Sequence, residues 1–378
     1  MIIYRYLFVE YLKVLVLCVI SFIAILLTTR LEEIARFAAS GGSGWTILKF
    51  ASLQIPYVLP IVLPVSSLIS AIVLSLRLSH TQELTTLRAS GLSLKRILSP
   101  ILITAAFIAL VNFYIVSEVA TESILGTRQM QREIAMINPL MLTQNKQLTR
   151  HRDFYIDTEN RAIAQSSLEG IIVAIWNNPI KRINLVTAKE IAFDEPNIHA
   201  KEMTMFSSFK PNKKDNFDNL YIENIRDSFM DVEGFSLYLK QKAAKVNDDY
   251  LKMSLLLSQI EILKEAASSE TLSLPESEDI KLKIRKSYTE IVRRASMGMS
   301  IFTLTLLGAS FGISTGRQKS FRNAYYVVGL SSILLVCIFA AKAFMQNTAI
   351  AMSLYFAPHA IILWLSTWNL KRITRGIE

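Results

Sequence analysis

Six long stretches with almost no charged side chains constrain this chain more than any other feature of its sequence. A helix needs about 20 apolar residues to cross the roughly 30 Å hydrocarbon core of a bilayer. The stretches that reach or approach this length are residues 6–29, 50–76, 97–117, 295–316, 323–341 and 349–370. Charged residues make up 19% of the chain, against roughly 25% in ordinary globular domains. The sequence therefore predicts an integral membrane protein with six transmembrane helices and excludes a simple soluble enzyme.

A polar segment, residues 118–294, separates the third apolar stretch from the fourth, so we expect three spans, one water-exposed domain and three more spans. Runs rich in β-branched and aromatic residues alternate there with turn residues. These runs are residues 154–157, 171–176, 183–193, 198–206 and 221–229. Such a series is typical of an antiparallel sandwich, jelly roll or barrel. Helical leucine spacing follows from residue 235 to about 267, and a second helix over residues 281–294 is expected to lead into the fourth span.

The predicted organisation has four parts. The first three spans occupy residues 1–117, with a short cytoplasmic helix at about 80–97. A β-jelly-roll-like domain follows at residues 118–234 and a helical segment at 235–290. The last three spans occupy residues 291–378.

The basic residues predict the orientation of the spans. The short segments on the side of the N-terminus hold twelve Lys and Arg against three Glu. Because basic residues concentrate in cytoplasmic loops, we expect both termini in the cytoplasm and the large domain on the opposite side. The net charge of +10 is therefore a property of membrane topology. This interpretation disfavours a nucleic-acid-binding function.

Motifs for catalysis or metal binding are absent from the sequence. No G-x-x-x-x-G-K-[S/T] phosphate-binding loop occurs, and the four His and two Cys residues form no cluster with metal-ligand spacing. The predicted spans contain no acidic pair, His–Glu set or Ser/Lys dyad, which disfavours a membrane enzyme. We expect no cofactor and no metal. An envelope scaffold or sensor with an outer β domain remains the alternative to a transporter.

Three segments carry a resemblance to a known family. They are residues 3–7 with Glu10 and Lys13, residues 60–64 through the run E-L-T-T-L-R-A-S-G at 83–91, and residues 290–294 leading to 307–312. Together they resemble the lipopolysaccharide export permeases of the LptF/LptG (YjgP/YjgQ) family, and the middle segment is the most specific. A longer helical stretch at residues 235–279 departs from the family pattern.

The resemblance implies a multi-pass inner-membrane permease with a periplasmic β-jelly-roll. Such a subunit pairs with a sister permease and with a dimer of a cytoplasmic ATPase. It lies in contact with membrane lipids and extracts lipopolysaccharide from the inner membrane. It then passes the lipopolysaccharide to periplasmic jelly-roll bridge proteins that lead to the outer membrane.

The helix after the second span is the candidate contact with the ATPase. Glu83, Leu84, Leu87 and Arg88 share one helical face. A helix that docks into a groove of the ATPase would transmit a push, with Glu83 meeting a basic residue there. In the alternative interpretation this is a solvated loop helix whose Glu83 pairs with Arg88.

Basic residues on the outer side are candidates for binding the lipid headgroup, because Arg pairs well with phosphate. The candidates are Arg30, Arg36, Arg293, Arg294 and Lys342. Alternatively, Glu32 and Glu33 pair with the first two, Glu290 and Glu118 neutralise the next two, and Lys342 extends to the membrane surface.

Four glycines of the fourth span are candidates for close helix contact, either with the sister subunit or within the chain. They are Gly298, Gly308, Gly312 and Gly316.

Overall fold

The computed structural model describes the chain in twelve segments separated by gaps, and the chain divides into two units. The residues outside the description are 1, 40–42, 138–147, 152–153, 161–166, 178–181, 195–196, 210–218, 232–249, 269–273, 314–320, 346 and 376–378. A helical unit comprises residues 1–34, 48–127 and 246–378, and a second unit, which carries the sheet, comprises residues 35–47 and 128–245.

Within the described residues, six helices are long and apolar enough to cross a membrane, as predicted. Three precede the strands: α1 (Ile2–Ala39), α2 (Gly44–His80), and a continuous helix made of α4 (Leu94–Tyr114), the π-helix η1 (Ile115–Val119) and α5 (Ala120–Ile137). Three follow them: α8 (Leu274–Gly312), α9 (Phe321–Ala341) and α10 (Thr348–Thr374). The predicted apolar stretches lie within these helices, except at the end of the fourth stretch. There residue 313 follows the end of α8, and residues 314–316 lie outside the described residues.

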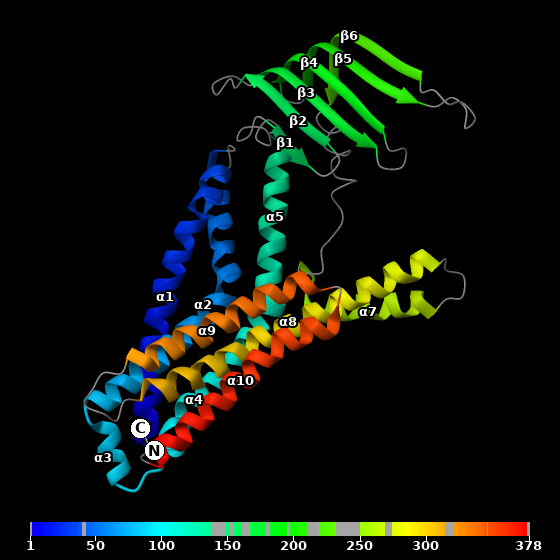
Figure 1. Ribbon diagram of the computed structural model, residues 1–378. Coiled ribbons are helices and arrows are strands. Elements are labelled where there is room, and N and C mark those ends of the chain that lie inside the picture. The colour runs from blue at the N-terminus through cyan, green and yellow to red at the C-terminus, as the bar shows by residue number, and fades with distance from the viewer. Residues whose placement is uncertain are drawn as a thin grey trace. The chain divides into compact units, whose positions relative to one another are not determined.

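Helix α8 lies at the centre of the helical unit, where it packs against α4, α9 and α10 (Figure 1). One apolar core cluster joins α8 to α2, α9 and α10 through buried residues that include Leu304, Leu334 and Tyr355. A second cluster contains Leu7 of α1, Leu78 of α2 and Ile373 of α10. The start of α1 and the end of α10 therefore meet at the same end of the bundle.

Glycines let α8 approach its neighbours closely. A Cβ added at Gly308 would lie 2.6 Å from the carbonyl oxygen of Leu68 in α2, and one at Gly312 would lie 2.9 Å from the Cβ of Ser75. A Cβ at Gly298 would lie 3.0 Å from that of Phe113 in α4. These three glycines therefore serve packing within the chain, which was one of the two alternatives; Gly316 lies outside the described residues.

The described part of the second unit forms one antiparallel sheet of six strands in the order β1-β2-β3-β4-β5-β6. The strands are β1 (Leu148–His151), β2 (Phe154–Asn160), β3 (Ser167–Asn177), β4 (Arg182–Asp194), β5 (Asn197–Phe209) and β6 (Asn219–Asp231). Strands β2 to β6 contain the five predicted runs, whereas β1 was not predicted. Each described strand pairs with the strand that follows it in the chain, and this arrangement is a meander. The jelly roll therefore stays a prediction.

The two faces of the sheet differ. On β3, Ile171 is buried while its neighbour Ile172 is exposed, and Ala188 opposite Ile171 is also buried. Because side chains alternate between faces along a strand, one face is covered at this point and the other is open. Lys201 of β5 forms a 3.0 Å ion pair with Glu190 of β4.

The polar segment ends in helix. Helix α7 (Met253–Ser268) falls within the predicted leucine-rich stretch, whose first part, up to residue 249, lies outside the described residues. Helix α8 begins at Leu274, with Pro275 in its first turn, where a missing backbone donor costs little. It runs without interruption into the fourth apolar stretch, as predicted.

Candidate functional site

The short helix α3 (Glu83–Ala89) follows α2 at the end of the bundle where both α1 and α4 begin (Figure 1). Helix α3 begins after Gln82, whose left-handed backbone (φ 59°) separates it from α2 and changes the direction of the chain. Leu84 is 3% exposed and belongs to the same core cluster as Leu7 and Leu78, and Leu87 packs against that cluster. Both leucines therefore pack α3 against the core of the helical unit.

Glu83 points toward α1. Its carboxylate accepts hydrogen bonds from the Tyr6 hydroxyl (3.2 Å) and from the Thr81 hydroxyl (3.0 Å). In the described part of the chain no ion pair joins Glu83 to Arg88, so the predicted alternative pairing within α3 is not formed. Arg88 is half-buried on the same helix.

A chain of polar contacts continues from Glu83 into α1 and α2. The Tyr6 hydroxyl accepts a 3.5 Å hydrogen bond from Arg77 of α2, and Arg77 forms an ion pair with Glu10 of α1. Lys13 pairs with the other oxygen of Glu10 at 3.0 Å. Ion pairs near the surface, of this kind, contribute little to stability. Their effect here is to connect α3 to α1 and α2.

Sequence reasoning did not identify Tyr6, Glu10 and Arg77 as members of a site. Tyr6 and Glu10 lay in a segment that resembles the family, and Arg77 counted only among the basic residues of a predicted cytoplasmic segment. The spacing of Tyr6 and Glu10, four residues apart on one helical face, was the only local sign. Their partners on α2 and α3 lie more than 65 residues away along the chain. That separation hides the contacts from any local pattern.

At the opposite end of α1, Arg30 has two partners. Its guanidinium forms a 2.8 Å ion pair with Glu33 and lies over the Tyr57 ring of α2, 4.5 Å from the ring centre. Arg36, in the last turn of α1, is exposed. Lys342, also exposed, begins the short helix η4 (Lys342–Phe344) between α9 and α10.

Arg293 and Arg294 in α8 share one carboxylate. Arg293 donates to Glu290 at 2.7 Å, and Arg294 donates to it at 2.9 Å. Arg294 is fully buried and Glu290 is 1% exposed. Arg294 also donates to the carbonyls of Leu251 (2.8 Å) and Ser117 (3.4 Å). Its guanidinium is thus directed into the protein, whereas part of the Arg293 side chain reaches the surface.

The residues that precede and begin α7 are attached to the third membrane helix close to Arg294. The backbone N–H of Met253 donates to the Glu118 carboxylate at 3.3 Å, and Lys252 pairs with Glu122 at 3.0 Å. The hydrogen bond to Glu122 raises the pKa of Lys252. Together with the bond from Arg294 to Leu251, these contacts fix the base of α7 against the π-helix η1.

A comparison with curated proteins finds no matching relative. The family model described as lipopolysaccharide export system permease LptF/LptG matches residues 5–372, nearly the whole chain. Six apolar helices of membrane-spanning length accompany that match. The chain therefore belongs to the lipopolysaccharide export system permease LptF/LptG family, a transporter component, and is a multi-pass protein of the inner membrane.

Proposed function

We propose that this chain is the permease subunit of an ABC transporter that extracts lipopolysaccharide from the inner membrane and passes it to a periplasmic bridge toward the outer membrane. Its sister permease and a cytoplasmic ATPase dimer complete the complex. ATP hydrolysis belongs to the ATPase, so the chain itself is not an enzyme. The family match over residues 5–372 supports this proposal.

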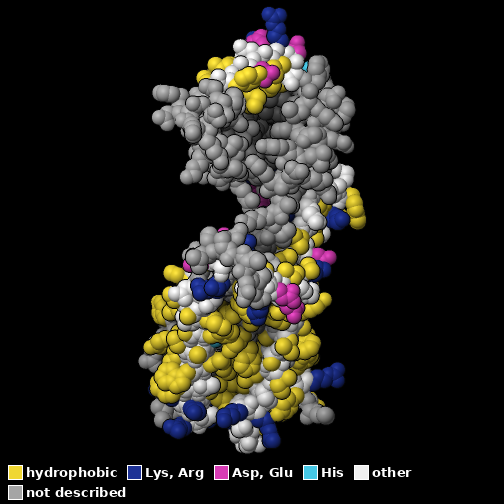
Figure 2. Space-filling view, turned by 90° about the vertical axis from the view of Figure 1, so that its right-hand side faces the viewer, with side chains coloured by type: hydrophobic (Ala, Val, Ile, Leu, Met, Phe, Trp, Pro, Cys, Tyr) yellow, Lys and Arg dark blue, Asp and Glu magenta, His cyan; other side chains and the backbone are white. Residues whose placement is uncertain are grey.

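In the proposed orientation, α3 and both termini lie in the cytoplasm and the β domain lies in the periplasm. Support comes from the distribution of basic side chains. Figure 2 shows a broad hydrophobic surface on the helical unit with Lys and Arg gathered at its lower end. Exposed basic residues at the α3 end of the bundle include Arg77, Lys95, Arg96, Lys371 and Arg375. Such an excess is typical of the cytoplasmic side.

The attachment of α3 is the observation that carries the mechanism. The buried side chain of Leu84 fixes one face of α3 to the core, while Thr85 and Thr86 face outward. A partner that docks on α3 would therefore push the core directly through Leu84 and Leu87. It would also act on α1 through the hydrogen bond between Glu83 and Tyr6. The ATPase would meet Glu83 and Arg88 at the margin of the exposed face.

The headgroup of the lipid would meet the basic residues at the other end of the bundle. Arg30, Arg36, Arg293 and Lys342 all have some solvent exposure. Arg294 is fully buried and hydrogen-bonded within the chain. The burial of Arg294 favours a role in positioning Arg293 through their shared partner Glu290.

The sheet supplies an edge for the bridge. Strand β6 is last in the sheet order and carries three exposed apolar residues, Leu220, Tyr221 and Ile222. An exposed strand edge can pair with a strand of another protein. Periplasmic jelly-roll proteins would continue the path from this edge.

The experiment separates a partner contact of Glu83 from its contact inside the chain. Glu83→Arg reverses the charge that meets the ATPase and also removes the acceptor for Tyr6. Tyr6→Phe removes only internal hydrogen bonds, those of the Tyr6 hydroxyl with Glu83 and Arg77, and Thr85→Ala is a control on the exposed face. We expect Glu83→Arg to abolish ATPase co-purification and lipopolysaccharide export, and Tyr6→Phe to preserve co-purification while lowering export.

Three results would contradict parts of this proposal. Normal co-purification and normal export in Glu83→Arg would remove Glu83 from the contact with the ATPase. Equal losses of co-purification in Glu83→Arg and Tyr6→Phe would assign Glu83 to an internal role alone. A wild-type chain that brings down neither an ATPase nor a related permease would favour the scaffold or sensor alternative.

A further inference from the structure

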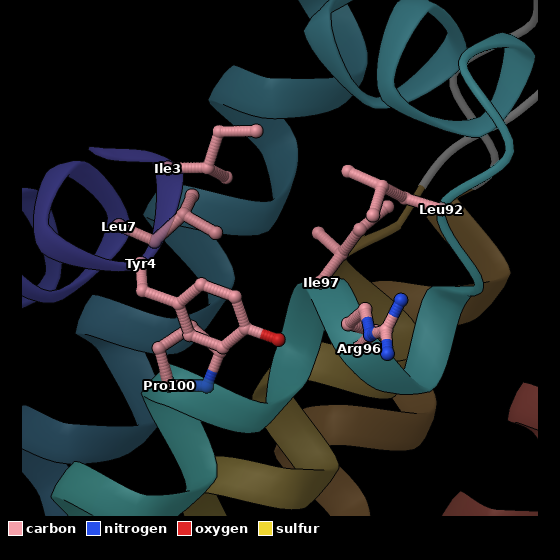
Figure 3. Close-up of a pocket in the computed structure, with 7 residues that line it drawn as sticks. All are labelled: Ile3, Tyr4, Leu7, Leu92, Arg96, Ile97 and Pro100. Carbon is pink, nitrogen blue, oxygen red and sulfur yellow. The ribbon is translucent and has the colours of Figure 1, made fainter. Parts of the chain in front are cut away.

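A pocket of about 350 Å³ lies between the first two turns of α1 and the beginning of α4. Its walls are Ile3, Tyr4 and Leu7 on α1 and Leu92, Arg96, Ile97 and Pro100 on or just before α4 (Figure 3). Five of these seven residues are aliphatic or proline. The pocket is therefore an apolar slot with two polar side chains.

The two polar side chains have no partner in the part of the chain that the structure describes. Arg96 is exposed, and its guanidinium forms no ion pair or hydrogen bond with another described residue. The same holds for the hydroxyl of Tyr4. In Figure 3 the Tyr4 phenol extends from α1 toward the turn of α4 that carries Arg96. The pocket thus combines a guanidinium and a hydroxyl donor, and both are available to a ligand.

The position of Arg96 at the start of α4 also favours an anion in the pocket. Arg96 lies in the first turn of α4, which begins at Leu94 after Ser93, and the Ser93 side chain does not cap the helix. The first N–H groups of a helix and its dipole favour a negative charge nearby. An anion at the Arg96 guanidinium would therefore also lie near the positive end of the α4 dipole.

We propose that this pocket binds an anionic phospholipid of the cytoplasmic leaflet, with the phosphate at Arg96 and Tyr4 and part of an acyl chain against Ile3, Leu7 and Ile97. Charge complementarity and the apolar walls carry the assignment, since basic pockets between membrane helices on the cytoplasmic side suit such headgroups. The inference rests on the orientation given under the proposed function. The site lies beside α3, so the lipid would brace the α1–α4 contact next to the coupling helix.

The test measures lipid binding by the delipidated full-length chain in detergent, with native mass spectrometry as the readout. Phosphatidylglycerol is the probe, and glycerol phosphate is added as a competitor. Arg96→Ala removes the pocket charge, while Lys95→Ala removes an equal charge from the neighbouring exposed residue, which does not line the pocket. Ile3→Trp fills the slot from an exposed position.

We expect wild type and Lys95→Ala to retain one phosphatidylglycerol that Arg96→Ala binds about tenfold more weakly, because a charge-assisted hydrogen bond is lost. Tyr4→Phe should bind about fivefold more weakly through loss of a neutral one. Ile3→Trp should exclude the lipid.

Equal binding by wild type and both Arg96→Ala and Ile3→Trp would overturn the proposal. Displacement of the lipid by glycerol phosphate would also overturn it, because the pocket would then recognise free phosphate. Export is not measured, so failure here leaves the proposed transport function standing, and failure of export leaves this site standing.

Discussion

Helices α1 and α8 have nearly the same length but very different surroundings. In the most apolar 18-residue window of α1 only 6% of the residues are buried, whereas 72% are buried in the corresponding window of α8. Yet α1 is the more apolar of the two along that window. The less hydrophobic helix is therefore the one at the centre. In a membrane protein, hydrophobicity identifies which segments are spans and does not identify which span lies inside.

Polar side chains explain why α8 lies inside. His359 of α10 lies between the hydroxyls of Ser296 (3.1 Å) and Thr303 (2.9 Å). Asn112 of α4 donates to the Met297 carbonyl at 3.1 Å. Helices in lipid associate through small residues and hydrogen bonds, since lipid tails are as apolar as leucine. Each of these groups would lose its partner if α8 faced lipid.

The largest expected effect tests the difference in burial between α8 and α1, by removing the Glu290 carboxylate that Arg293 and Arg294 share. Glu290→Ala removes the carboxylate that pairs with the fully buried Arg294, and breaking a buried ion pair costs about 3–5 kcal/mol. Glu33→Ala removes the half-exposed partner of Arg30 on α1, which should cost below about 1 kcal/mol. Denaturant titration in detergent micelles would measure both changes in the free energy of unfolding. Equal losses would refute the distinction between the two helices.

A methyl group at the contact of α8 with α2 should have the next largest effect. Gly308→Ala places a Cβ 2.6 Å from the Leu68 carbonyl oxygen, and overpacking of this kind costs about 1–3 kcal/mol. Gly329→Ala in α9 is the matched control, because nothing lies within 4 Å of its added Cβ. The thermal midpoint of the purified chain should fall only for the first variant. A Gly308→Ala protein as stable as wild type would show that α2 and α8 separate without penalty.

The smallest effect concerns the polar contact between α1 and α8 themselves. Tyr11→Phe removes the 3.2 Å hydrogen bond between the Tyr11 and Thr305 hydroxyls, and such bonds between membrane helices average about 0.6 kcal/mol. Tyr325→Phe alters an exposed phenol of α9 and should leave stability unchanged. The same titration would compare them. A loss above about 2 kcal/mol for Tyr11→Phe would exceed the average hydrogen bond between membrane helices and show that α1 is held as firmly as α8.

The sequence predicted the spans and the strands because their evidence is local. Apolar length identified α1, α2 and α9, and β-branched runs identified β3 to β5. The arrangement within the bundle depends on contacts between distant residues, so it was not predictable. The hydrogen bond of Tyr6 with Glu83 joins residues 77 positions apart. Likewise, charge alone indicated that Arg293 and Arg294 could meet lipid, and only the fold places Arg294 inside the protein.

The π-helix η1 changes how the third membrane helix must be mapped. A wide turn of this kind adds about one residue to the regular repeat, and one residue corresponds to about 100° around a helix axis. Positions on α4 and α5 that would share a stripe on an uninterrupted helix therefore point in different directions. Any scan of labels or crosslinkers along residues 94–137 will change phase between Ile115 and Val119. The two stretches must be assigned their lipid-facing and protein-facing sides separately.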